Sequence, residues 1–326
     1  MANRVCDILG IEKPIIQGPA LWLTDAEYVA ACCEAGVLGV LGLNAGQTEY
    51  VYTVEETMER TREQIRKIKA LTDKPFALNV GPIDPKVDQF TAPTLELMAE
   101  EGVSAALYWG EVIPYWFDRF HEKGIKVIFR AATPTIENTK AAVAAGADII
   151  VATGFDEGGT LPVQAVGTFS IVPMLADAAE GKVPIVACGG IADERTAKAA
   201  FVLGAEGLLV GTAFLLSEES LVADNIKQAV VRLNAEDMMM YRVLPAFYRT
   251  MPGELPDKLV AMSKSGASEA DIFEAQHKHL GIRNGMLFGD LSKGFASFGL
   301  GISMIHSIEP VAVIVNRLMD GIREYL

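Results

Sequence analysis

The feature that most constrains this fold is an alternation of short apolar runs with segments of helical periodicity. Runs that are apolar on both faces are typical of parallel strands covered by helices. Eight such units, at roughly 25-residue spacing, predict an α/β protein built as a (β/α)8 TIM barrel. The competing open, doubly wound sheet needs a glycine-rich fingerprint after its first strand, and QGPALW lacks one. The predicted strands span residues 14–18, 38–43, 75–80, 104–109, 126–131, 148–154, 184–190 and 207–212.

The alternation stops after Thr212. Residues 213–287 show helical periodicity and no convincing strand, whereas the C-terminal stretch EPVAVIVNRLMDGIREYL has the pattern of a closing barrel helix. We therefore predict a barrel of residues 1–212 plus 288–326 and a small helical insertion of residues 213–287. An insertion after the eighth strand lies near the C-terminal mouth of the barrel. It is either a lid over that mouth or a structural cap or oligomer surface, and a homodimer is one expected partner.

Charge and composition exclude several classes of protein. The net charge of -14 over 326 residues argues against nucleic acid and anionic membrane as partners, because both need a cationic face. The start MANRVCDILGIEK does not resemble a signal peptide, and no uncharged apolar run reaches about 18 residues. The four cysteines have no CxxC spacing, which indicates reduced thiols. We predict a cytoplasmic location.

In a parallel barrel the chemistry gathers where strands end, and two of these loops are rich in glycine. ACGGIADERTAKAA follows the seventh strand and VGTAF follows the eighth. Glycines there let backbone N–H groups approach an anion, and a helix N-terminus adds its positive end. The sequence therefore predicts a phosphate-binding site made by Gly189, Gly190, Gly211 and Thr212.

The stretch GFDEGGTLP follows the sixth strand, beside the predicted phosphate site. Gly158 and Gly159 would let a flat ligand lie against the backbone. The alternative is a simple turn in which Asp156 and Glu157 are solvated.

Several segments together resemble one known family. QGPALWLTDAEYVAACCEAGVLGVLG, FALNV, GFDEGG, VPIVACGGIAD, LGAEGLLVGTAF and GDLSKGFASFGLGISMI occur in the order typical of nitronate monooxygenases, formerly called 2-nitropropane dioxygenases, a family that includes flavin-type enoyl-ACP reductases. The resemblance implies a barrel that holds FMN, with a small helical domain over its mouth. Some members also use NAD(P)H as reductant.

The resemblance also assigns site residues. It implies that Arg130, at the end of the fifth strand, stabilises the negative charge of reduced flavin; the alternative for this residue is an ordinary ion pair. The residues that it implies for cofactor binding are Gly18, Pro19, Ala20, Asn79, Arg130, Gly158, Gly159, Gly189, Gly190, Gly211 and Thr212.

The chain departs from the family pattern around the expected substrate. Thr160 occupies the position where relatives have a histidine that acts as base or acid. Relatives often have methionine at the position of Ala20 and glutamine at the positions of Leu209 and Leu300. A threonine hydroxyl does not accept a proton at neutral pH. We therefore expect a strong preference for preformed nitronates over neutral nitroalkanes.

Three functions remain open at this stage. The first is oxidation of alkyl nitronates with O2, and the second is NAD(P)H-dependent reduction of an ene or enoyl thioester. The third is a barrel that binds flavin or another ligand without catalytic activity. Thr160, Arg130 and Tyr108 are the predicted catalytic residues, and the substrate is a small molecule or an acyl thioester. Other proton-donor candidates are Glu111, Tyr115, His277 and His279; HKH lacks a third ligand at metal-site spacing, so no metal is expected.

Overall fold

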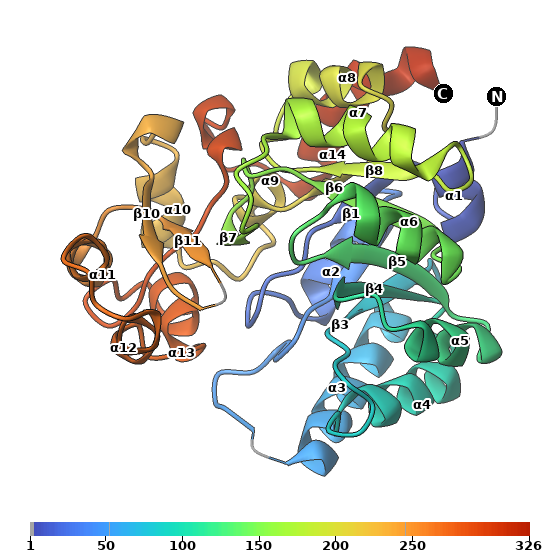
Figure 1. Ribbon diagram of the computed structural model, residues 1–326, viewed down its shortest axis with the longest axis horizontal. Helices are drawn as coiled ribbons and strands as arrows, with labels where there is room; N and C mark the ends of the chain where they lie inside the picture. The colour runs from blue at the N-terminus through green and yellow to red at the C-terminus, as the bar shows by residue number, and fades with distance from the viewer. Residues whose placement is uncertain (1–2, 52, 245) are drawn as a thin grey trace.

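The computed structural model describes residues 3–51, 53–244 and 246–326 and confirms the barrel (Figure 1). Its eight strands pair in parallel in the order β1-β9-β8-β6-β5-β4-β3-β2. A parallel bridge between Ile16 and Leu38 joins the two ends of this sheet. The strands are β1 Ile15–Gln17, β2 Gly39–Leu41, β3 Phe76–Val80, β4 Ala105–Gly110, β5 Lys126–Ala131, β6 Ile149–Thr153, β8 Ile185–Cys188 and β9 Gly207–Val210.

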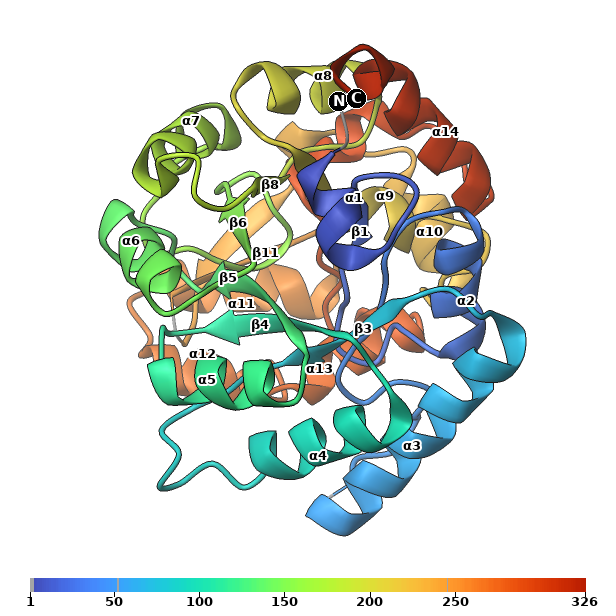
Figure 2. The same cartoon turned by 90° about the vertical axis from the view of Figure 1, so that its right-hand side faces the viewer.

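A ring of helices surrounds the strands, as the end-on view of Figure 2 shows. Each follows its strand in the chain, so every strand–helix unit predicted from the sequence is present. The ring consists of α2 Ala26–Glu34, α3 Val54–Leu71, α4 Thr91–Glu101, α5 Pro114–Glu122, α6 Ile136–Ala144, α7 Thr168–Ala179, α8 Glu194–Val202 and α14 Val311–Ile322. Side-chain hydrogen bonds cap the N-termini of several helices. At the beginning of α2, for example, the Asp25 carboxylate accepts the N–H of Tyr28.

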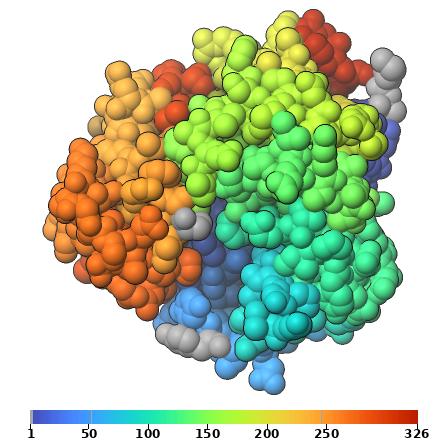
Figure 3. Space-filling model, in the orientation of Figure 1, coloured from blue at the N-terminus to red at the C-terminus, as the bar shows by residue number. Residues whose placement is uncertain are grey.

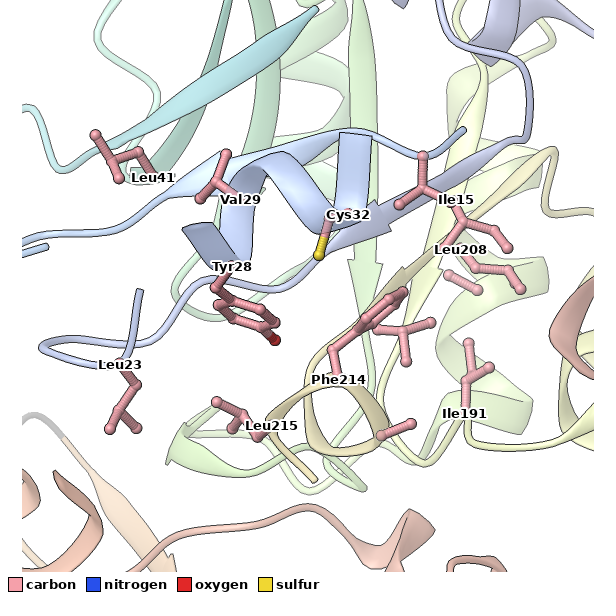
Figure 4. Packing of buried hydrophobic residues seen from close by; sticks show 14 of the residues in the cluster. Ile15, Leu23, Tyr28, Val29, Cys32, Leu41, Ile191, Leu208, Phe214 and Leu215 are labelled. Atoms are coloured by element: carbon pink, nitrogen blue, oxygen red, sulfur yellow. The ribbon is translucent and has the colours of Figure 1, made fainter. Parts of the chain in front are cut away.

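Two separate apolar clusters form the core. The inner one fills the barrel with side chains such as Ile16, Val40 and Leu107, and α1 (Arg4–Leu9) closes its N-terminal end with Val5 and Leu9. The outer cluster lies between the strands and the helices. Figure 4 shows part of this outer layer, where Tyr28 and Cys32 of α2 lie near Phe214.

The segment after β9 differs from the expected all-helical insertion. It contains a β-hairpin of β10 (Met239–Arg242) and β11 (Phe247–Thr250), and β11 also pairs with β7 (Gly159–Leu161). The prediction of no strand was wrong, because β11 has its second partner about ninety residues away in sequence and local periodicity does not register such pairing. The helical pieces are α9 Thr212–Leu215, α10 Asp224–Val230, η1 Ala235–Asp237, α11 Glu254–Lys264, α12 Glu269–Ala275, α13 Leu280–Ile282 and η2 Arg283–Leu287.

The chain returns from the insertion through residues 288–310, which include η3 (Leu300–Met304), and it ends in η4 (Arg323–Tyr325). Part of this return packs on the insertion: the Phe295 ring lies 4.9 Å from that of Tyr248. In Figure 3 the insertion, in orange, stands beside the barrel with a recess between the two. Among the described residues, no helix is long and apolar enough to cross a membrane.

Candidate functional site

A cavity of about 520 Å³ lies at the C-terminal ends of the barrel strands and extends under the insertion. Barrel loops supply one wall. The opposite wall comes from the insertion and the return segment, with large apolar side chains such as Tyr248, Phe273, Met286 and Phe295. The site residues predicted from sequence that line it are Gly18, Pro19, Ala20, Asn79, Arg130, Gly158, Gly159, Thr160, Gly189, Gly190, Gly211 and Thr212.

The glycines after β8 and β9 expose backbone to the cavity. Gly189 and Gly190 have φ values of +106° and +70°, which side chains other than glycine rarely adopt. The N–H groups of Gly190 and Ile191 donate to no other residue that the structure describes. A Cβ on Gly211 would meet no described atom within 4 Å, so this glycine leaves open space in the cavity. Free N–H groups beside open space suit an anionic ligand.

Gly18 has a different reason to be glycine. A Cβ there would lie 3.0 Å from the Cα of Gly211, so its small size permits the close approach of the chains that leave β1 and β9. Gly18 therefore positions the wall rather than opening it.

The segment after β6 is neither solvated nor a simple turn. A Cβ on Gly158 would lie 2.6 Å from the carbonyl carbon of Phe298, and the N–H of Gly159 donates to the Ser297 hydroxyl at 2.6 Å. The Asp156 carboxylate accepts the N–H of Thr168, at the start of α7, at 2.6 Å. The return segment thus fixes GFDEGG in place along the cavity.

Thr160 lies within β7, directly opposite Tyr248 of β11, and both residues line the cavity. The sequence placed this threonine in a turn, whereas the structure places it in a short strand that joins barrel and insertion.

Arg130 and Glu157 form an ion pair inside the cavity. Arg130 stands at the end of β5 and also donates from Nε to the Thr153 hydroxyl at 3.3 Å. The Glu157 side chain is only 7% exposed, and its backbone carbonyl accepts a hydrogen bond from the buried guanidinium of Arg249. Burial raises the pKa of Glu157 to about 7, although the positive charge of Arg130 opposes this rise. Sequence reasoning missed Glu157 as a cavity group.

Tyr108, a predicted catalytic residue, does not line the cavity. Its fully buried ring packs 5.0 Å from Phe117 and 5.8 Å from Phe129, in the layer between barrel and helices. Successive side chains of a strand point to opposite faces, so Leu107 and Trp109 of β4 face the cavity and Tyr108 faces outward. This alternation of side chains along β4 was the signal in the sequence that would have identified Trp109, rather than Tyr108, as a residue that lines the cavity.

The remaining proton-donor candidates are divided. His279 lines the cavity from the insertion, beside Lys278. Glu111 is exposed and Tyr115 is half exposed, 50%, against Trp116; neither lines the cavity. Within the described residues, no group of three or more His, Cys, Asp or Glu side chains is arranged to hold a metal ion.

Comparison with known proteins fits this geometry. The sequence profile described as nitronate monooxygenase matches residues 2–321. The chain belongs to the nitronate monooxygenase family. It is an oxidoreductase of this type, and the expected resemblance is confirmed.

Curated relatives of the family carry more than one activity. The chain is 32% identical over 262 residues to a nitronate monooxygenase of Pseudomonas aeruginosa, covering 68% of this chain and 71% of the relative. It is 31% identical over 279 residues to a Mycobacterium tuberculosis protein named (3aS,4S,5R,7aS)-5-hydroxy-7a-methyl-1-oxo-octahydro-1H-indene-4-carboxyl-CoA dehydrogenase, covering 84% and 73%.

Solved structures agree on the fold. FabK from Thermotoga maritima superposes with a TM-score of 0.85 at 28% identity, covering 100% of this chain and 97% of FabK. A nitroalkane oxidase from Streptomyces ansochromogenes gives a TM-score of 0.79 at 22% identity, covering 98% of each chain, and supports the fold alone.

Proposed function

We propose that this protein is an FMN-dependent oxidoreductase that oxidises alkyl nitronates with O2 as electron acceptor. FMN, when bound, supplies the electron-transfer chemistry. The residues present fit this cofactor: the free N–H groups of Gly190 and Ile191 and the open space at Gly211 suit its phosphate. Asn79, Gly158 and Gly159 provide polar and bare backbone surface along the rest of the cavity.

The observation that carries the proposal is the Arg130 guanidinium in a mostly apolar cavity beside the glycine loops. A fixed positive charge in a site with little water favours anions, most strongly below pH 7, where its partner Glu157 is neutral. Arg130 would hold the anionic nitronate and the anionic reduced cofactor, while the insertion wall keeps water from the reacting carbon.

A second candidate is the NAD(P)H-dependent reduction of an enoyl thioester or related ene. Two observations favour it. The insertion and the return segment supply an apolar wall of Phe273, Ile282, Met286 and Phe295, which is larger than a small nitroalkane needs. The M. tuberculosis relative is named as a dehydrogenase of a carboxyl-CoA substrate.

One set of measurements separates the two candidates. The purified protein is expected to be yellow and to release FMN on heating. Anaerobic NADH or NADPH should leave the flavin oxidised, whereas ethyl nitronate should consume O2. Rapid bleaching by NAD(P)H, with turnover of an enoyl thioester and none of nitronate, would establish the second candidate. A protein that takes up no FMN would exclude both.

A further inference from the structure

Glu157 is held in place through its side chain, its backbone and the two residues that follow it. Arg130 of β5 pairs with its side chain, and Arg249 of β11 donates to its backbone carbonyl. The two residues that follow it are fixed by contact with Phe298 and by the hydrogen bond to Ser297. A carboxylate held this firmly, and only 7% exposed, keeps a constant position relative to a ligand in the cavity.

The groups that face Glu157 leave it able both to accept and to deliver a proton. Arg130 and Arg249 favour its charged form, and burial favours its neutral form more strongly, so its pKa rises to about 7. Burial also raises the pKa of Cys188 of β8 and of Tyr248 of β11, which both interact with Glu157, so these two groups stay neutral near pH 7. A group that titrates near the working pH is an efficient acid–base catalyst.

Thr160 does not provide a proton-transfer group in the cavity. It lines the same cavity, three positions beyond Glu157, in the place where the family resemblance implies a histidine. Its hydroxyl does not accept a proton at neutral pH. His279 also lines the cavity, but it belongs to the insertion wall, and burial lowers its pKa below the ordinary histidine value.

We propose that Glu157 is the acid–base residue of this enzyme, oriented by Arg130. The inference rests on the proposed function. With a neutral nitroalkane, a Glu157 oxygen takes the proton from the carbon beside the nitro group. The C–H electron pair forms the C=N bond of the nitronate, whose negative charge on oxygen faces Arg130. Glu157 then loses its proton to water before the next cycle.

In the reductive candidate the same carboxyl group would act as an acid instead of a base. Neutral Glu157 would give its proton to the α-carbon of an enoyl thioester, while FMN reduced by NAD(P)H, when bound, would supply the hydride for the β-carbon. The carboxylate regains a proton from water.

This assignment changes the substrate preference expected from Thr160 alone. The wild-type enzyme should accept neutral nitroalkanes, and removal of the Glu157 carboxylate should leave an enzyme restricted to preformed nitronates.

The test compares flavin-loaded wild type, Glu157→Gln and the matched control Glu101→Gln. Glu101 is also buried and paired with arginines, Arg62 and Arg66, but lies on α4 away from the cavity. In Glu157→Gln we expect kcat/KM for nitroethane to fall about 10²–10⁴-fold. Oxidation of preformed ethyl nitronate needs no proton removal from carbon, so its kcat/KM should fall by a much smaller factor than that for nitroethane. The rise of kcat/KM for nitroethane with a pKa near 7 should disappear from the pH profile.

Two readouts do not depend on turnover. Wild type should speed the exchange of the nitroethane α-hydrogen for deuterium without O2, as seen by NMR, and Glu157→Gln should not. Infrared difference spectra should show a carboxyl group that titrates near pH 7 in wild type and in Glu101→Gln but is absent from Glu157→Gln.

Four outcomes would overturn the assignment. Equal losses on nitroethane and nitronate in Glu157→Gln would mark a structural ion pair. A comparable loss in Glu101→Gln would show a general stability effect. Loss of the pH dependence in His279→Gln instead would move the role to the insertion. Absence of a carboxyl group that titrates near pH 7 from the infrared spectra of the wild type would refute the role of Glu157, even if the protein held no flavin.

Failure of the proposed nitronate oxidation can be distinguished from failure of the role proposed for Glu157. If the flavin-loaded enzyme reduces only an enoyl thioester, Glu157→Gln should slow that reduction while the anaerobic bleaching of the flavin by NAD(P)H keeps its wild-type rate. Unchanged reduction in that variant would refute the role of Glu157 there as well.

Discussion

At the scale of single residues, the Arg130–Glu157 pair places two buried charged groups in the cavity. The arginine side chain is 22% exposed and the glutamate 7%, so their interaction is screened far less than a surface pair. Because Glu157 titrates near pH 7, the pair changes from net positive to net neutral across the physiological range.

Arg130→Met is expected to lower the reduction potential of the bound flavin, because the anionic reduced form loses a positive neighbour. A shift of about 30 mV corresponds to about 1.4 kcal/mol for a two-electron couple, and we expect about one to two times that value. The shift should be largest below pH 7, where Glu157 does not compensate the arginine. Equilibration with reference dyes measures the potential. No change at any pH would leave Arg130 with a purely structural role.

Glu157 also makes stability depend on pH. Its pKa in the folded protein, about 7, lies above its ordinary value of 4.5, so the folded state binds more protons between these values. The free energy of unfolding should therefore fall as pH rises from 4.5 to about 7, by at most about 1.4 kcal/mol per pH unit from this group. Urea unfolding at several pH values should show this slope in wild type and lack it in Glu157→Gln. An equal slope in both proteins would assign it to other groups.

At the scale of elements, the loop between β9 and α9 tests the phosphate site. Gly190 is a poor probe, since its φ is +70° and a Cβ would lie 3.2 Å from that of Asp156. Gly211 has ordinary backbone and open space, so Gly211→Asp adds a charge without strain. FMN should bind at least about tenfold more weakly to Gly211→Asp than to the isosteric Gly211→Asn. Equal affinities, measured by flavin fluorescence, would place the phosphate elsewhere.

The hairpin β10–β11 connects insertion and barrel through β7, and Arg249 secures that connection. Its buried guanidinium donates to the Glu157 carbonyl and lies 5.6 Å from the centre of the Phe155 ring. Arg249→Leu should lower the free energy of unfolding by about 1–3 kcal/mol and increase hydrogen exchange in β7. Arg242→Leu, on the neighbouring strand with a side chain that is 58% exposed, is the control and should change little. Similar effects of the two substitutions would contradict the anchoring role.

At the scale of the whole molecule, the cavity joins two parts of the fold, so its ligand should stabilise both. FMN in hundredfold excess over its Kd should add about 2.7 kcal/mol to the free energy of unfolding. Thermal unfolding should then remain one transition that moves to higher temperature with FMN. A second transition that ignores FMN would show that the insertion unfolds independently of the site.

The sequence by itself determined the barrel and the positions of its ligand loops. Each strand–helix unit is a local pattern of about 25 residues, and the rule that ligands gather at the C-terminal strand ends is general. Gly190 and Gly211 were found on that basis, whereas Arg130 was assigned through the family resemblance, and the structure brings all three to one cavity.

Only the tertiary structure decided which side chains face that cavity and what their charges do there. Tyr108 was assigned to the wrong face because successive side chains of a strand point to opposite faces, and the run of aromatic residues around Tyr108 hides this alternation. Glu157 reads as a solvated turn residue, but in the structure Arg249 donates to its carbonyl, and Phe298 and Ser297 pack against the two glycines that follow it. All three partners are distant in sequence. Burial and the partner of a charge are properties of that assembly, and they set its pKa and hence its chemistry.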